Sequence, residues 1–169
     1  YGVANTQVFD PKSRVNTFVH VNHKPDKKRY GVLLCINGTG ILNSWMQKNI
    51  FHGMSYSEMN TLAASVAPGS NGVAVLPFGN GSERMLNNKN IGAHITGLDF
   101  NRHEPAHLFR AVQEGVVFGM QYGFKVLQQN GVQPTVIRAG KANMFLSDVF
   151  VDCFVNTLQV PLELYHTDG

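Results

Sequence analysis

The chain has 169 residues, of which 43% are hydrophobic and 15% are charged, and this composition excludes an intrinsically disordered protein. The formal net charge is only +3, and the one dense cationic cluster, at residues 24–29, is predicted to be a solvated hairpin loop. Because no basic face with interleaved aromatic residues is present, we expect no nucleic-acid partner. The apolar runs are short, so we expect no membrane partner and a cytoplasmic location.

The first part of the chain predicts strands followed by helices. Three runs have the alternation and the side chains that are typical of β-strands: residues 1–9, 15–22 and 30–36. They follow one another closely, which favours an antiparallel meander. Apolar residues at helical spacing predict a helix from Ile41 to Phe51. A second helix is predicted from the capping box of Ser55 and Glu58 to about Val66.

The second part of the chain alternates strands with helices. The predicted strands are residues 73–78, 93–98, 135–139 and 160–165, and the predicted helices are residues 104–130 and 143–158. Residues 79–92 are polar and follow neither period, so we expect a long loop there. The chain is therefore predicted to be α/β, with a mixed sheet flanked by helices. This order also fits one half of an actin-like ATPase domain, a ribonuclease-H-like unit.

Three glycines recur at four-residue intervals in the longest predicted helix, at Gly115, Gly119 and Gly123. Each glycine in a helix costs about 1 kcal/mol relative to alanine, so three on one face need a reason. The close approach of another backbone is the simplest reason, and we expect packing rather than a binding function.

Two glycine-containing turns each lie between a predicted strand and a predicted helix. Such turns are where α/β proteins commonly hold phosphates and nucleotides. The candidate nucleotide-binding residues are Gly38, Gly40, Asn43, Gly140, Ala142 and Asn143. The alternative is that the glycines only end the strands, and that Asn43 only faces solvent.

Other polar residues carry weaker signals. Glu83 and Arg84 are neighbours in the long loop, where they form either a surface ion pair or, with Arg84, part of an interdomain cleft. The histidines and the two cysteines show no metal-ligand spacing, and no serine or cysteine nucleophile accompanies them. We therefore assign no metal site and no catalytic residue to this chain.

Four segments, in the right order, resemble the C-terminal half of the FGGY carbohydrate kinases. They are NGTGILNSWM, NGVAVLPFGNGSER, VIRAGKANMFLSDVFVDCF, and a signature made of Ala93, Ile95, Gly97, Leu98, His107, Leu108, Ala111, Val112 and Glu114. Gln113 departs from that signature, which prefers an apolar residue there, and we expect it to turn toward solvent. Lys141 departs from a turn that usually has three small residues, and could reach a phosphate or block the nucleotide.

The resemblance implies a function. It implies an ATP-dependent sugar kinase that uses Mg²⁺, and it is strongest to the xylulose kinase group, which makes D-xylulose the expected sugar. In the family the catalytic base and the sugar site belong to the N-terminal domain, so the chain alone is expected to be inactive. The alternative is a non-catalytic binding or assembly module of the actin-like superfamily, in which Lys141 marks lost ATP use.

The two ends of the sequence suggest a piece of a larger protein. The chain begins inside a β-like run and stops at Thr167-Asp168, a helix-capping pair with no helix after it. We therefore expect residues 1–169 to be one partial domain, the nucleotide-binding half of the kinase, truncated at both ends. An exposed sheet edge would favour pairing into a homodimer.

Overall fold

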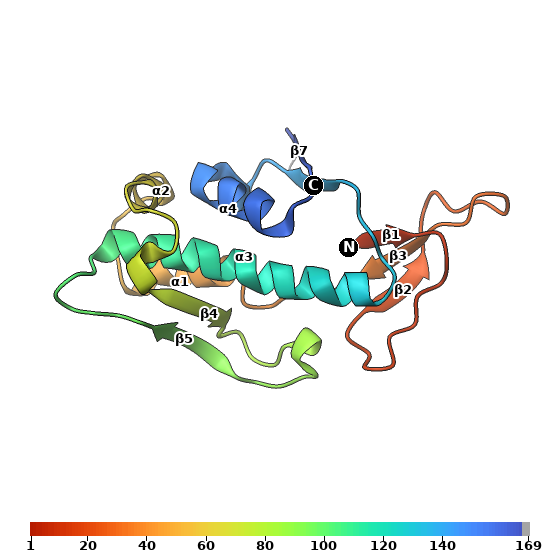
Figure 1. The fold of residues 1–169 in the computed structure, drawn as a ribbon, viewed down its shortest axis with the longest axis horizontal. Coiled ribbons are helices and arrows are strands. Elements are labelled where there is room, and N and C mark those ends of the chain that lie inside the picture. Colours follow the sequence, from red (N-terminus) through yellow and green to blue (C-terminus); the bar gives the residue numbers. More distant parts are fainter. Residues whose placement is uncertain (167–169) are drawn as a thin grey trace.

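One long helix organises the molecule. The computed structural model describes residues 1–166, and in it α3 (Pro105–Gln129) runs through the middle with the other elements along its length (Figure 1). Pro105 occupies the first turn, where its missing N–H costs nothing. The backbone N–H of Glu104 donates to Nδ1 of His107 at 3.1 Å, which ties the start of the helix to its own side chain.

The first three strands form an antiparallel sheet, but they do not form a meander. β3 (Tyr30–Leu33) lies in the middle and pairs with both β1 (Gly2–Ala4) and β2 (Asn16–Val19). The expected meander is wrong because the segment between β1 and β2 crosses to the far edge of β3. Val8 and Val15, in that segment, are buried in the same cluster as Val32 and Val126.

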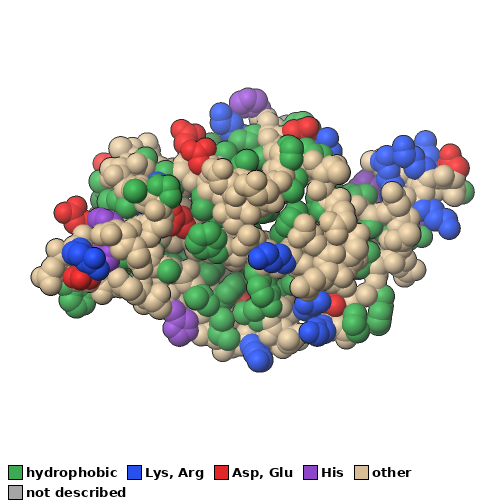
Figure 2. All heavy atoms as spheres, in the orientation of Figure 1, with side chains coloured by type: hydrophobic (Ala, Val, Ile, Leu, Met, Phe, Trp, Pro, Cys, Tyr) green, Lys and Arg blue, Asp and Glu red, His purple; other side chains and the backbone are tan. Residues whose placement is uncertain are grey.

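The predicted hairpin loop between β2 and β3 is confirmed. Lys24 and Lys27 exchange backbone hydrogen bonds at 3.1 Å, and His20 N–H donates to the carbonyl of Arg29 at 3.2 Å. Figure 2 shows Lys and Arg side chains gathered at the end of the molecule where Figure 1 places this loop. The cations of residues 24–29 thus lie together at one solvated tip.

The remaining strands form two further pairs. β4 (Ala74–Phe78) pairs with β5 (Gly92–Thr96) in an antiparallel ladder, and β4 packs on α3. β6 (Ile137–Gly140) and β7 (Leu162–Tyr165) run parallel. The predicted α/β fold is therefore confirmed, but the strands are distributed over three small sheets, two antiparallel and one parallel, in place of the expected mixed sheet.

The helices cover α3 from several sides. They are α1 (Gly40–Asn49), α2 (Tyr56–Ala64) and α4 (Asp148–Leu158), with short 3₁₀ turns η1 (Ser70–Gly72), η2 (Arg84–Leu86) and η3 (Asn143–Leu146). The capping box of Ser55 and Glu58 is confirmed. The single helix predicted over 143–158 is wrong, because Ser147 caps a new helix there: its Oγ accepts from the N–H of Phe150.

Gln113 lies inside the molecule and not on its surface. Its side chain is 2% exposed; its Oε1 accepts from the Ser147 hydroxyl at 2.7 Å, and its Nε2 donates to Oδ1 of Asn60 at 3.0 Å. The expectation that Gln113 turns toward solvent is therefore wrong. A buried amide is stable when its partners are present, and this one ties α3 to α2 and to the start of α4.

The glycines of α3 are packed against other elements, but the expected close approach of a second backbone is confirmed only at Gly115, since Gly119 and Gly123 meet side chains. A Cβ at Gly115 would run into the backbone carbonyl of Val75, on β4. At Gly119 the nearest atom is Cγ of Pro77 at 3.2 Å, so the contact there is with side chains and is looser. Close approach of a second backbone thus explains Gly115 directly.

Candidate functional site

The first glycine turn is held against β4. Gly38 is buried, and a Cβ there would collide with the carbonyl oxygen of Pro77, so the turn needs glycine for packing. The backbone N–H groups of Asn37 and Gly38 both donate to Oε1 of Glu83, at 2.9 and 3.0 Å. The turn is therefore fixed by β4 on one side and by a buried carboxylate on the other.

The start of α1 presents free backbone N–H groups. Thr39 is the N-cap residue, and its side chain makes no capping hydrogen bond. Within residues 1–166 the N–H groups of Thr39, Gly40 and Ile41 have no acceptor, whereas the N–H of Leu42 donates to the Thr39 carbonyl at 3.1 Å. Gly40 is exposed, with no atom within 4 Å of where its Cβ would be. A helix N-terminus in this state suits an anion.

The second glycine turn follows β6. Gly140 pairs with Tyr165 on β7, and the carbonyl of Tyr165 also accepts the N–H of Lys141 at 2.8 Å. Ala142 N–H donates to the carbonyl of Gly140 at 2.9 Å. Asn143 is exposed and left-handed, with φ of 52°. The turn leads into the short 3₁₀ turn η3, and α4 starts only after Ser147, so this turn is not followed directly by an α-helix N-terminus.

One apolar cluster lies beside both turns. Its buried residues come from α3 and α4: Val116, Val117, Phe150, Phe154 and Leu158. Leu42, just after the first turn, packs against it, and so do Met144 and Phe145, just after the second. The fold therefore brings the two predicted nucleotide-binding turns to the edge of a common core.

Asn43 is partly exposed on α1. It lies about 200° around that helix from Ile41, so the side chains of Asn43 and Ile41 are on nearly opposite faces of α1.

Arg84 does not pair with its neighbour. Its Nε donates to the carbonyl of Ser13 at 2.6 Å, while Glu83 is fully buried. Of the two alternatives, the surface ion pair is therefore wrong, because the side chain of Glu83 contacts Asn37 and Gly38 whereas that of Arg84 contacts Ser13. The role of Glu83 in holding the first turn was missed from the sequence. The only signal for it was that Glu83 belongs to NGVAVLPFGNGSER, one of the segments that carry the family resemblance.

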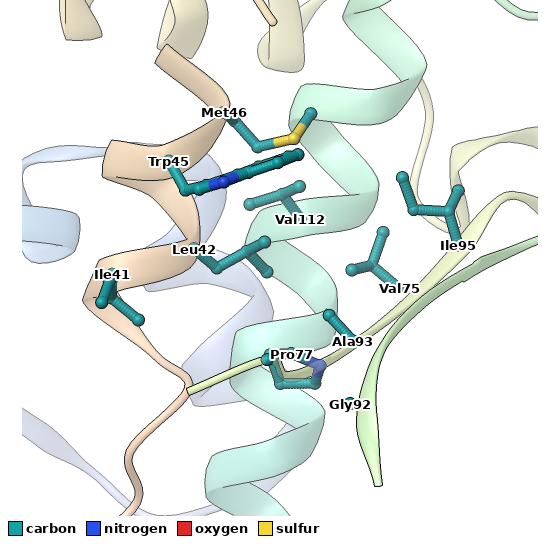
Figure 3. A pocket seen from close by; sticks show the side chains of 11 residues that line it. Ile41, Leu42, Trp45, Met46, Val75, Pro77, Gly92, Ala93, Ile95 and Val112 are labelled. Atoms are coloured by element: carbon teal, nitrogen blue, oxygen red, sulfur yellow. The ribbon is translucent and has the colours of Figure 1, made fainter. Parts of the chain in front are cut away.

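An apolar groove of about 470 Å³ lies between α1 and the β4–β5 hairpin. Figure 3 shows side chains of α1 on one side and those of β4 and β5 on the other. The lining residues are Ile41, Leu42, Trp45, Met46, Val75, Pro77, Gly79, Gly92, Ala93, Ile95 and Val112. The lining includes none of the predicted nucleotide-binding residues and no acidic, basic or histidine side chain. The groove therefore has no group for acid–base chemistry.

Among residues 1–166, no three His, Cys, Asp or Glu side chains gather closely enough to hold a metal ion. None of the helices in that range combines the length and the hydropathy that crossing a membrane requires.

Comparison with known proteins gives one consistent family. Residues 4–168 match the sequence profile of the C-terminal domain of the FGGY family of carbohydrate kinases. A xylulose kinase from Haemophilus influenzae is 34% identical over 106 residues, which are 63% of this chain and 21% of that protein.

Solved structures agree with this match at the level of the fold. A ligand-bound xylulose kinase from Lactobacillus acidophilus superimposes with a TM-score of 0.82 at 22% identity, over 99% of this chain and 33% of that one. A Plasmodium falciparum glycerol kinase with ADP gives a TM-score of 0.79 at 21% identity, over 98% and 32%. The chain thus spans between a fifth and a third of the length of these relatives. With the family profile matched over nearly all of its residues, the chain belongs to the FGGY family of carbohydrate kinases and has the fold of their C-terminal domain.

Proposed function

We propose that this chain is the nucleotide-holding part of an ATP-dependent sugar kinase. The first glycine turn supplies the phosphate side of the site, with the free N–H groups of Thr39, Gly40 and Ile41 as donors. The second turn, with Gly140, Ala142 and Asn143, lies beside the adenosine. The observation that carries the proposal is the uncapped start of α1 in a chain that matches the family over residues 4–168.

The sugar is proposed to be D-xylulose. The support is the 34% identity to a xylulose kinase, although the similar structures also include a glycerol kinase. The chain itself contributes no catalytic base, and we propose that the base and the sugar contacts come from the N-terminal domain of the intact enzyme. Arg84 is proposed to border the cleft between the two domains.

Magnesium is proposed to come with the nucleotide. The described residues offer no cluster of ligands for it, and Mg²⁺ is commonly bound through substrate phosphates and one or two carboxylates. When bound with ATP, it would neutralise charge on the phosphates. The residues of this chain would supply only the backbone donors around those phosphates.

The test is a coupled assay of ATP turnover on the full-length protein with Mg²⁺. The sugars are D-xylulose, L-ribulose, glycerol and gluconate. Turnover with D-xylulose and a markedly lower kcat/KM for the other three is the expected result. Preference for another sugar would replace the substrate and keep the reaction class. A well-folded protein that turns over ATP with none of these sugars would favour a non-catalytic module.

A further inference from the structure

Glu83 is a buried carboxylate without a cation. Its side chain is 0% exposed, and none of the ion pairs among residues 1–166 includes it. Its side-chain contacts are instead with the backbone: Oε1 accepts from Asn37 at 2.9 Å and from Gly38 at 3.0 Å, and Oε2 lies 3.2 Å from the same Asn37 nitrogen. Burying a carboxylate without a cation is costly, and the hydrogen bonds from the two backbone N–H groups offset part of that cost.

The loop around Glu83 aims this carboxylate. The N–H of Glu83 donates to the carbonyl of Lys89, and its own carbonyl accepts from Leu86 and Asn88, all at 3.0 Å. The side chain of Met85 is buried and anchors the loop beneath α3. The segment predicted to lack regular structure is therefore closed on itself, with the Glu83 side chain pointing at the first glycine turn.

Two further hydrogen bonds hold the same turn. The Asn37 side chain donates to the carbonyl of Ser82 at 2.8 Å, and Asn80 Nδ2 donates to the carbonyl of Asn37 at 3.2 Å. Two consecutive N–H groups thus point inward to Glu83, while the next three, from Thr39 to Ile41, have no acceptor within the described part of the chain. The change of direction occurs at Gly38, where Pro77 leaves no room for a side chain.

We propose that Glu83 is a positioning residue for nucleotide binding. By holding the N–H groups of Asn37 and Gly38, it sets the course of the backbone into α1 and leaves the N–H groups of residues 39–41 aimed at the nucleotide phosphates. This inference rests on the proposed kinase function. Because the side chain of Glu83 contacts only the turn that leads into the proposed phosphate donors, its loss should weaken the binding of ATP and spare the binding of the sugar.

The experiment compares two buried carboxylates in the full-length enzyme. Glu83→Gln keeps the size of the side chain but removes the charge, and places an amide NH₂ or a weaker acceptor against the backbone N–H groups. Glu114→Gln is the control, because Glu114 is also buried and also accepts a backbone N–H, that of Gly69 at 3.0 Å, away from the glycine turn; unlike Glu83, it also pairs with Arg110 at 2.8 Å. KM for ATP, KM for the sugar, kcat and Tm are measured for each.

The expected result separates positioning from stability. E83Q should raise KM for ATP about tenfold and leave KM for the sugar unchanged. The reason is that weaker hydrogen bonds between residue 83 and the turn should lower the affinity for ATP by about that factor. E114Q should lower Tm and leave both KM values unchanged. Unchanged KM for ATP in E83Q, or an equal rise in E114Q, would overturn the assignment.

Two further outcomes are covered by the same design. If E83Q does not fold, Asn80→Ala is the second variant, since Asn80 is exposed and its substitution removes one hydrogen bond to the same turn. N80A should raise KM for ATP about threefold, because a neutral hydrogen bond is weaker than one to a charged group. An unchanged KM for ATP in N80A would count against the assignment. A wild-type enzyme that does not turn over ATP would overturn the proposed function, and this role of Glu83 with it. An active wild type with an unaffected E83Q would overturn only the role of Glu83.

Discussion

Among residues 1–166, three carboxylates are buried with backbone N–H groups as partners. Asp10 and Glu114 also have a cation on the same segment, Arg14 and Arg110, whereas Glu83 has none. In each case the carboxylate holds a stretch of irregular backbone: the turn after β1 for Asp10, the loop after α2 for Glu114 and the glycine turn for Glu83. Single acidic residues therefore fix the parts of the chain that helices and strands do not.

Asp10 should make stability depend on pH in the acid range. Hydrogen bonds from the Arg14 side chain, foremost, lower the pKa of Asp10 to about 2. A carboxyl group with a lowered pKa stabilises the folded state fully above its unfolded value, near 4, and that stability is lost as pH falls toward 2. Asp10→Asn should therefore lose about 1–2 kcal/mol of unfolding free energy at pH 7, and converge with wild type near pH 2.

Urea unfolding at several pH values checks this prediction. Asp26, exposed in the β2–β3 loop, supplies the control variant Asp26→Asn, which should follow the wild-type curve. A constant difference between wild type and D10N from pH 7 to pH 2 would show that the ionised form of Asp10 does not matter.

Gly40 offers a test in which stability and binding move in opposite directions. A side chain fits there, because no atom lies within 4 Å of the Cβ position. An aspartate in the first turn of a helix is stabilising by about 0.3–1 kcal/mol, yet its charge would occupy and repel the proposed phosphate site. Gly40→Asp in the full-length enzyme should therefore raise Tm and raise KM for ATP about tenfold or more, since an opposing charge near the phosphates costs over 1.4 kcal/mol.

Gly40→Ala is the matched control, since it adds a side chain without charge. It should raise Tm and leave KM for ATP within about twofold of wild type, as alanine is the better helix former. If G40D binds ATP as well as G40A does, phosphates do not approach the start of α1.

At the scale of elements, contacts across α3 decide which substitutions the fold accepts. Gly115 is pressed against the backbone of β4, whereas Gly119 meets only the ring atoms of Pro77 and Phe78. Backbone cannot move aside as a side chain can, so equal changes at the two positions should have unequal costs. The chain thus contains its own control for the effect of helix propensity.

Gly115→Ala should destabilise the domain although alanine favours helices. The added methyl group meets the Val75 carbonyl, and overpacking of this kind costs about 1–3 kcal/mol, more than the propensity gain of about 1 kcal/mol returns. Gly119→Ala should change the unfolding free energy by less than about 1 kcal/mol, and the larger Gly119→Leu should cost about 1–3 kcal/mol. Urea midpoints measure all three; G115A at or above the wild-type midpoint would contradict the prediction.

The order and type of the elements could be predicted from the sequence, but several of their contacts could not. Apolar periodicity predicts α3, and the Ser55–Glu58 spacing predicts the start of α2, because both signals are local. The central position of β3 depends on how residues far apart in the chain pack together. The helix break at Ser147 did have a local signal, since serine before aspartate is a common N-cap, but the apolar run across it concealed the boundary.

The candidate site was predictable only in part. Glycine between a strand and a helix points to the two turns directly. Glu83 escaped because its partners, Asn37 and Gly38, lie 46 and 45 positions away and are backbone groups with no side-chain signature. Gln113 differs in that its partners are side chains, those of Asn60 on α2 and of Ser147 at the start of α4, but these residues are also far from it in the sequence. Glutamate and glutamine are mostly found at protein surfaces, so residue type alone places Glu83 and Gln113 there. Their side chains can be buried only because the fold supplies hydrogen-bond partners for them.

At the scale of the whole molecule, the chain should bind nucleotide without performing the reaction. It spans 21% to 33% of the relatives described above, and the family resemblance places the base and the sugar contacts outside it. The isolated chain should bind ADP more weakly than the full-length enzyme does, and should phosphorylate no sugar. Calorimetry with ADP and the coupled assay check the two parts; sugar phosphorylation by the isolated chain would refute the division of roles.

The long helix has a consequence for how the domain opens. Buried clusters at the start, middle and end of α3 include Val112, Val116 and Val126, one from each, and the surrounding sheets and helices pack on them. Few parts of the domain can therefore unfold locally while the backbone of α3 stays protected from hydrogen exchange. The unfolding of α3 itself would expose all three clusters to solvent. The backbone N–H groups at its centre should exchange with deuterium only through complete unfolding, so their exchange rates would report the stability of the entire domain.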